Sequence, residues 1–142
     1  MADLPKEIFL EVATPLGKQL EVSTDSVQVP SVAGEFGVLP GHLPLLAAIK
    51  PGILQYRADG KMVRVAIGAG YAEGNADRVR VISEFFVRAE DVDLERAQED
   101  LQEATERLKH PEGTTEDTSY VEAQRNHDWA QARIDLAGTA QN

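Results

Sequence analysis

Cysteine is absent from this chain of 142 residues, and the absence removes several kinds of chemistry. It excludes disulfides, thiolate nucleophiles and Cys-ligated metals or clusters, although it does not indicate a cellular compartment. Histidines occur only at positions 42, 110 and 127, far apart and without the paired spacing of zinc ligands. We therefore predict no metal site and no redox role.

Long apolar runs are missing as well. No stretch approaches the roughly 18 consecutive apolar residues of a membrane-spanning helix. The first six residues show neither the apolar core of a secretory signal nor the Arg-rich character of a transit peptide, so we expect a cytoplasmic protein. With 42% hydrophobic and 27% charged residues, the composition is typical of a compact domain, alone or with an appendage.

Bases are scarce in the C-terminal part of the chain. Residues 1–89 carry ten acids and nine bases, whereas residues 90–142 carry fourteen acids and five bases. A surface of negative sign repels the phosphates of nucleic acids and anionic lipid headgroups. Since no basic stripe interrupts the acidic part, we predict no binding to nucleic acid.

Patterns typical of catalysis are also lacking. Ser23, Ser26 and Ser31 lie in predicted strands or turns without a nucleophile elbow or a local base. The glycines of residues 68–74 have the wrong last spacing for a dinucleotide loop and no helix follows them, so we predict a turn or bulge there. An enzyme is disfavoured, and we predict no catalytic residues.

Short runs of alternating apolar and polar residues occupy the first 88 positions, separated by turn residues. No helical period intervenes to make parallel crossovers, so this pattern favours a β-sandwich or barrel. Examples of the predicted strands are residues 8–12, 18–22, 26–29, 52–56, 62–67 and 78–82.

After Arg88 the spacing of apolar residues changes from two to the three-and-four spacing of a helix. One helix is predicted to end at residues 109–113, and another to start at the capping-box sequence of residues 119–122. A short polar segment joins them, so we expect an antiparallel hairpin. The apolar stripes are Leu94, Ala97, Leu101, Ala104 and Leu108 in the first helix, and Tyr120, Ala123, His127, Ala130, Ile134 and Ala137 in the second.

Small residues occupy many positions of this seam between the helices. Burial stabilises by ~0.8 kcal/mol per CH₂ group, so alanines contribute far less than leucines. Isolated helices of this length are marginal in water. We therefore predict a β-domain at residues 1–88 and, at residues 89–142, a helical arm that depends on the surface it rests against and adopts more than one arrangement.

Glycines and prolines alternate with apolar residues in the motif at residues 34–52, which reads GEFGVLPGHLPLLAAIKPG. On physical grounds it is either an ordinary pair of turns or a stiff, exposed docking loop that returns into a buried strand. Its residue order closely resembles the signature of the epsilon subunits of F-type ATP synthases. Residues 88–97, RAEDVDLERA, resemble the start of the C-terminal helices in that family, and the resemblance covers roughly residues 8–136.

This resemblance implies a ten-stranded β-sandwich followed by a C-terminal antiparallel two-helix hairpin. In the family the sandwich binds the gamma subunit and rests on the c-ring, as a non-catalytic rotor part that couples proton transport to ATP synthesis. The arm folds against the sandwich or extends toward the alpha and beta subunits, where it inhibits ATP hydrolysis. The chain is then expected at the cytoplasmic face of the cell (inner) membrane, as a peripheral protein held there by the complex.

The resemblance also assigns the contact with the c-ring and gamma to the first part of the motif. A rigid loop with one acid and one imidazole loses little entropy on binding and offers a few polar contacts. The partner-contacting residues implied in this way are Glu35, Phe36, Gly37, Val38, Leu39, Pro40, Gly41 and His42.

Some family members hold ATP between the folded helices, through an Ile/Leu-Asp-x-x-Arg-Ala motif and arginines of the second helix. Asp93, Arg96 and Arg133 match these positions and are the candidate residues for weak nucleotide binding. Val87 stands where nucleotide-binding members have an acid, and Trp129 replaces one arginine. A lost charge-assisted contact costs about 1.5 to 3 kcal/mol, so we expect no bound cofactor and at most weak ATP affinity.

Alternatives stay open from the residues alone, both for the candidate site and for the function. Asp93 can instead cap the first helix, while Arg96 pairs with Glu99 or Asp100 of the same helix. At the level of function, a β-domain adaptor with an unrelated helical tail and a small enzyme remain. Neither of these explains the motif, the change of period and the marginal arm together.

Overall fold

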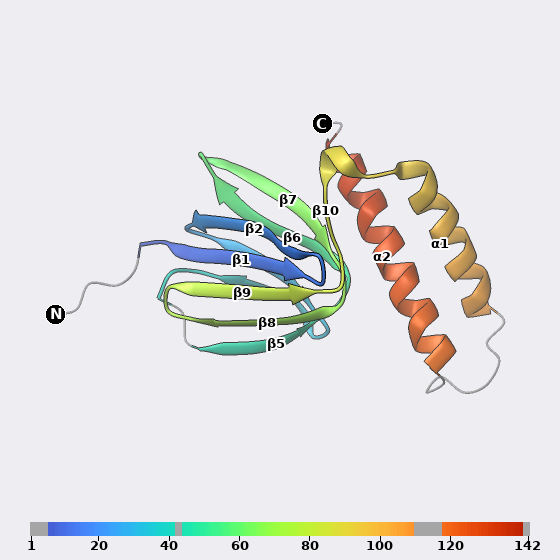
Figure 1. Ribbon diagram of the computed structural model, residues 1–142, viewed down its shortest axis with the longest axis horizontal. Coiled ribbons are helices and arrows are strands. Elements are labelled where there is room, and N and C mark those ends of the chain that lie inside the picture. Colours follow the sequence, from blue (N-terminus) through green and yellow to red (C-terminus); the bar gives the residue numbers. More distant parts are fainter. Residues whose placement is uncertain (1–5, 42–43, 110–117, 141–142) are drawn as a thin grey trace.

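The computed structural model describes residues 6–41, 44–109 and 118–140. Ten strands form one sheet that folds into a sandwich, and two helices stand across one end of it (Figure 1). The predicted ten-stranded sandwich followed by a helical hairpin is confirmed. The elements are β1 (Ile8–Thr14), β2 (Gly17–Thr24), β3 (Val27–Ser31), β4 (Gly34–Val38), β5 (Leu45–Ile49), β6 (Gly52–Ala58), β7 (Lys61–Ile67), β8 (Gly70–Asn75), β9 (Arg78–Ser83), β10 (Phe86–Arg88), the 3₁₀ turn η1 (Ala89–Asp91), α1 (Leu94–Lys109) and α2 (Thr118–Ala140).

The strand order is β10-β7-β6-β3-β5-β8-β9-β1-β2, with β4 beside β3. The pairings are antiparallel, except that β1 runs parallel to β9. Alternation of side chains builds the core: in β1, Ile8, Leu10 and Val12 are fully buried, while the residues between them are partly exposed. The main core therefore lies inside the sandwich.

Strand β4 corrects the sequence-based expectation, because this segment was predicted as a loop. Gly34 has a φ of 115° and provides the turn from β3. Phe36 and Val38 are more buried than Glu35 and Gly37, which alternate with them, as the period of two in a strand requires. The glycines of the motif concealed that alternation in the sequence.

Strand β8 corrects a second expectation, the turn or bulge predicted for residues 68–74. Its first residue, Gly70, lies against β9 so closely that an added Cβ would be 1.9 Å from the carbonyl oxygen of Ile82. Glycine is needed there for a close approach of two strands rather than for a turn.

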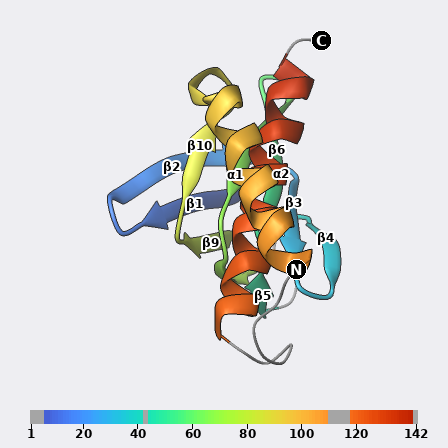
Figure 2. The same cartoon turned by 90° about the vertical axis from the view of Figure 1, so that its right-hand side faces the viewer.

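The two helices pack on each other, and α2 lies between the sandwich and α1 (Figures 1 and 2). Ala97 and Ala104 of α1 and Ala123 and Ala130 of α2 are buried, which confirms the seam of small residues. Helix α2 begins at Thr118, slightly earlier than predicted. Neither described helix is long and apolar enough to cross a membrane.

A second apolar face of α2, which the sequence analysis missed, contacts the sandwich. Ala132 and Leu136 pack on the buried Ala66 of β7. Partly buried side chains surround this small cluster, including Ile53 of β6 and Trp129 of α2. The cluster is separate from the main core, so a limited contact holds the arm in place.

Replacement of Leu136 by alanine should loosen α2 without unfolding the sandwich. Leu136 is fully buried in the small cluster, and such truncations cost about 2 to 5 kcal/mol, with the low end expected where the site can relax. Hydrogen exchange of α2 amides should accelerate while the exchange of β1 and β9 stays slow. The control is Val121→Ala, at an exposed position of the same helix. Equal exchange in the two variants would contradict the assigned contact.

Candidate functional site

The motif predicted as one docking loop is spread along β4 and the turn that follows it. Glu35, near the start of β4, lines a cavity together with Asp128 and Gln131 of α2, so it lies at the end of the sandwich that carries the arm. At the other end of the segment, the N–H of Gly41 donates to the carbonyl oxygen of Ala76 at 2.7 Å. The structure therefore does not gather these residues into one compact loop.

The outer side of this segment is open. Strand β4 pairs only with β3 among the described strands, which leaves its other edge free of ladder hydrogen bonds. Glu35 and Gly37 are exposed, Leu39 is 62% exposed, and Leu46 of β5 is 76% exposed. His42, the last residue of the predicted set, lies outside the described residues.

Of the three residues predicted to bind a nucleotide, Arg96 and Arg133 contact a common carboxylate, whereas Asp93 contacts the start of its own helix. Asp93 accepts a hydrogen bond from the N–H of Arg96 at 3.1 Å, which is the helix cap anticipated as an alternative. Asp100 joins the two arginines: its Oδ1 lies 3.1 Å from Nε of Arg96, and its Oδ2 lies 2.9 Å from Nη2 of Arg133. Arg96 and Arg133 therefore meet at a carboxylate of the chain itself.

Trp129 connects this ion pair to the sandwich. Its ring stacks on Phe85, which lies between β9 and β10, with centroids 5.1 Å apart and an interplanar angle of 22°. The guanidinium carbon of Arg133 is 5.3 Å from the Trp129 ring centroid, within the range of a cation–π contact. Sequence reasoning noted only that Trp129 replaces an arginine, since the stack with a residue 44 positions earlier leaves no local signal.

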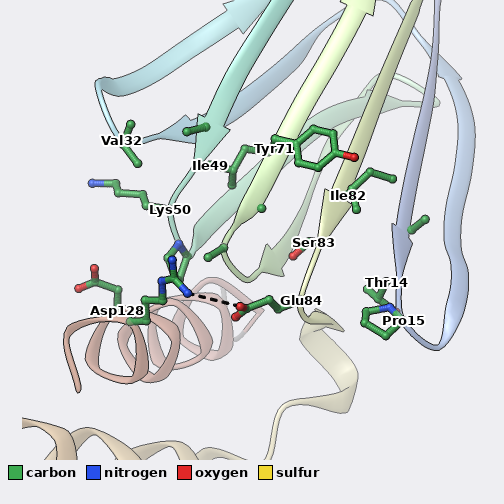
Figure 3. A pocket seen from close by; sticks show the side chains of 16 residues that line it. Thr14, Pro15, Val32, Ile49, Lys50, Tyr71, Ile82, Ser83, Glu84 and Asp128 are labelled. Carbon is green, nitrogen blue, oxygen red and sulfur yellow. Dashed lines mark ion pairs between the residues drawn. The ribbon is translucent and has the colours of Figure 1, made fainter. Parts of the chain in front are cut away.

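Two further cavities border α2. One, of about 270 Å³, lies between the helices and is lined by residues that include Arg96, Asp100 and Arg107. The other, of about 700 Å³, lies between α2 and the strand ends (Figure 3). The dashed line in Figure 3 marks an ion pair between Arg125 and Glu84 at 3.7 Å. Both side chains are about half exposed, so this ion pair contributes little to the docking of α2.

A cluster of charged side chains lies on the side of the sandwich formed by β1, β2 and β9. Lys18 Nζ is 3.0 Å from Glu21 and 3.2 Å from Glu11, and the Glu11 carboxylate is also 3.2 Å from Nε of Arg80. The hydrogen bonds with Glu21 and then Glu11 raise the pKa of Lys18 above its ordinary value. These groups neutralise one another and offer no strong attraction for a charged partner.

Comparisons with known proteins match two family models to successive parts of the chain. The family model described as ATP synthase, Delta/Epsilon chain, beta-sandwich domain matches residues 7–89. The model described as ATP synthase, Delta/Epsilon chain, long alpha-helix domain matches residues 90–138. Each part of the chain therefore resembles the corresponding part of one family.

Relatives and solved structures agree with the family models. An ATP synthase epsilon chain of Nitratidesulfovibrio vulgaris (strain DP4) is 37% identical over 137 residues, which cover 96% of this chain and all of the relative. That of Synechococcus sp. (strain WH7803) is 38% identical over 92% of this chain and 96% of its own. A chain in the mitochondrial ATP synthase of Euglena gracilis shares the fold, with a TM-score of 0.79 at 22% identity over 96% of this chain and 84% of that chain. The protein belongs to the ATP synthase epsilon-chain family.

Proposed function

We propose that this protein is a central-stalk rotor subunit that links gamma to the c-ring, and that its arm inhibits ATP hydrolysis. Members of its family are subunits of ATP synthase other than the catalytic one. The observation that carries the inhibitory role is the attachment of the two described helices to the sandwich mainly through one small apolar cluster. The complex would hold the chain at the cytoplasmic face of the cell (inner) membrane as a peripheral protein.

The rotor role is supported by a sandwich with a continuous apolar core and by the unpaired outer edge of strand β4. The residues proposed to meet the c-ring and gamma are those at positions 35–42, along β4 and its following turn. Exposed Glu35, Gly37 and Leu39 lie on an ordered strand or next to it, so they lose little entropy when a partner binds. Because the segment spans the sandwich, its two ends can meet different partners.

The inhibitory role is supported by the balance of forces on the arm. Complete burial of Leu136 contributes about 1.5 to 3 kcal/mol, and the alanines beside it contribute much less. A docked state favoured by a few kcal/mol leaves a minor population of released arms. Contacts with gamma, alpha and beta need to supply only that difference to stabilise an extended arm.

Removal of residues 89–142 should raise ATP hydrolysis by the assembled complex and leave coupling largely intact. An increase of roughly two- to tenfold is expected if the arm blocks between half and nine-tenths of the complexes. Hydrolysis is measured on the complex reconstituted with the full-length or the shortened chain. The control is binding of gamma by the shortened chain, which tests its sandwich directly.

That experiment tests the inhibitory role and the rotor role independently of each other. Unchanged hydrolysis with normal assembly would refute the inhibitory arm and leave the rotor role standing. Failure of a correctly folded sandwich to bind gamma would refute the rotor role.

Substitution of Gly37 by glutamate should weaken docking to the c-ring. No atom lies within 4 Å of a Cβ built at Gly37, so the strand accommodates the new side chain and only a partner surface is disturbed. An added charge in an interface costs several kcal/mol, and at least about tenfold lower affinity is expected. Gly41 is a poorer choice because its φ of 86° makes any replacement strained.

Co-purification with the c-ring and gamma measures this effect, and Gly37→Ala is the matched control. Both variants should keep the unfolding transition of the parent chain. If the glutamate variant co-purifies as the alanine variant does, Gly37 is not part of the interface.

A further inference from the structure

We propose that Asp100 is a built-in anion that holds the folded arm together, in the position where a bound phosphate would otherwise meet the arginines. Its carboxylate contacts Arg96 from the same helix and Arg133 from the facing helix. The folded arm of this chain is therefore held by its own charges, and we infer that it does not depend on ATP.

The geometry of the ion pair distinguishes it from an ordinary surface contact. The side chain of Arg133 is 13% exposed and that of Asp100 is 26% exposed, so solvent screens their attraction only partly. One carboxylate oxygen faces each guanidinium group, which satisfies both arginines at once. Loss of the carboxylate would leave Arg133 charged and mostly covered, which is unfavourable.

The residues that would have to hold ATP do not fit that role. Asp93 is engaged with the N–H of Arg96 as a helix cap, and Asp100 places a negative charge between the arginines that a phosphate would need. The ring of Trp129, which stacks on Phe85, stands at the position of one of the arginines expected of a nucleotide site. The remaining cavity of about 270 Å³ lies below the roughly 300 to 1,000 Å³ typical of ligand pockets.

The same contacts continue to the sandwich. Asp100 holds Arg133, Arg133 lies over the ring of Trp129, and Trp129 stacks on Phe85. Closure of the hairpin and docking of α2 are thereby linked, since Arg133 and Trp129 belong to one turn of one helix. Ionic strength should act on the arm through this ion pair, whereas ATP should not.

Trp129 supplies the measurement, because the chain has a single tryptophan and it lies at the junction of arm and sandwich. Fluorescence of the full-length chain should not change with millimolar ATP, and calorimetry should detect no micromolar binding. In Asp100→Asn the fluorescence should shift toward that of a released arm, and hydrogen exchange of α2 should show arm opening about tenfold more favourable.

The matched control is Glu99→Gln, which removes the same charge from the neighbouring exposed position of α1. Pyrophosphate is the probe for the vacated site: it should restore the parent fluorescence in Asp100→Asn and leave the parent chain unchanged. A double-mutant cycle of Asp100→Asn with Arg133→Gln should give a coupling of about tenfold, which separates the ion pair from a general loss of folding.

Three results would overturn the proposal. Micromolar binding of ATP to the parent chain would show that the site is free for a nucleotide. Equal behaviour of Asp100→Asn and Glu99→Gln would show that Asp100 has no special part in the arm. No response of Asp100→Asn to pyrophosphate would reduce Asp100 to a simple helix contact. These readings use the isolated full chain, so they do not depend on whether the arm inhibits hydrolysis.

Discussion

The contact between α2 and the ends of β6 and β7 determines the state of the whole arm. Helix α2 has one face for α1 and another for the sandwich, whereas α1, among the described elements, packs mainly on α2 (Figure 1). If α2 leaves, α1 leaves with it. A short row of apolar side chains around Leu136 thus governs the position of all the helical residues. The sandwich has its own core, which is separate from this contact.

Apolar packing and charge play different parts at this junction. The cluster around Leu136 favours contact but has little directional preference. The contacts of Asp100 with Arg96 and Arg133, and the ring of Trp129 against Phe85, require particular distances and orientations. Packing therefore keeps α2 near the sandwich, and the polar and aromatic contacts select one arrangement of it.

The sequence predicted those features that repeat along one element. Alternation of apolar residues revealed the sandwich, and spacings of three and four revealed the hairpin, because each element buries a face. The same logic anticipated the contact between Arg96 and Asp100, one helical turn apart, and the cap by Asp93.

Features that join distant elements were not predictable in this way. Arg133 meets Asp100 across 33 positions, and Leu136 is buried only because β6 and β7 happen to face it. The strand at β4 was missed because its glycines weaken the apolar pattern, although Phe36 and Val38 do alternate.

The parallel pairing of β1 with β9 has a consequence for biosynthesis. The first strand finds this neighbour only after the chain has been made as far as Ser83, so the sheet cannot close early. Once β10 has emerged from the ribosome, however, every strand is available, whereas the residues of α1 and α2 have not yet emerged. The ribosome therefore delivers the arm to a sandwich that is able to fold already, which keeps the helices on the outside.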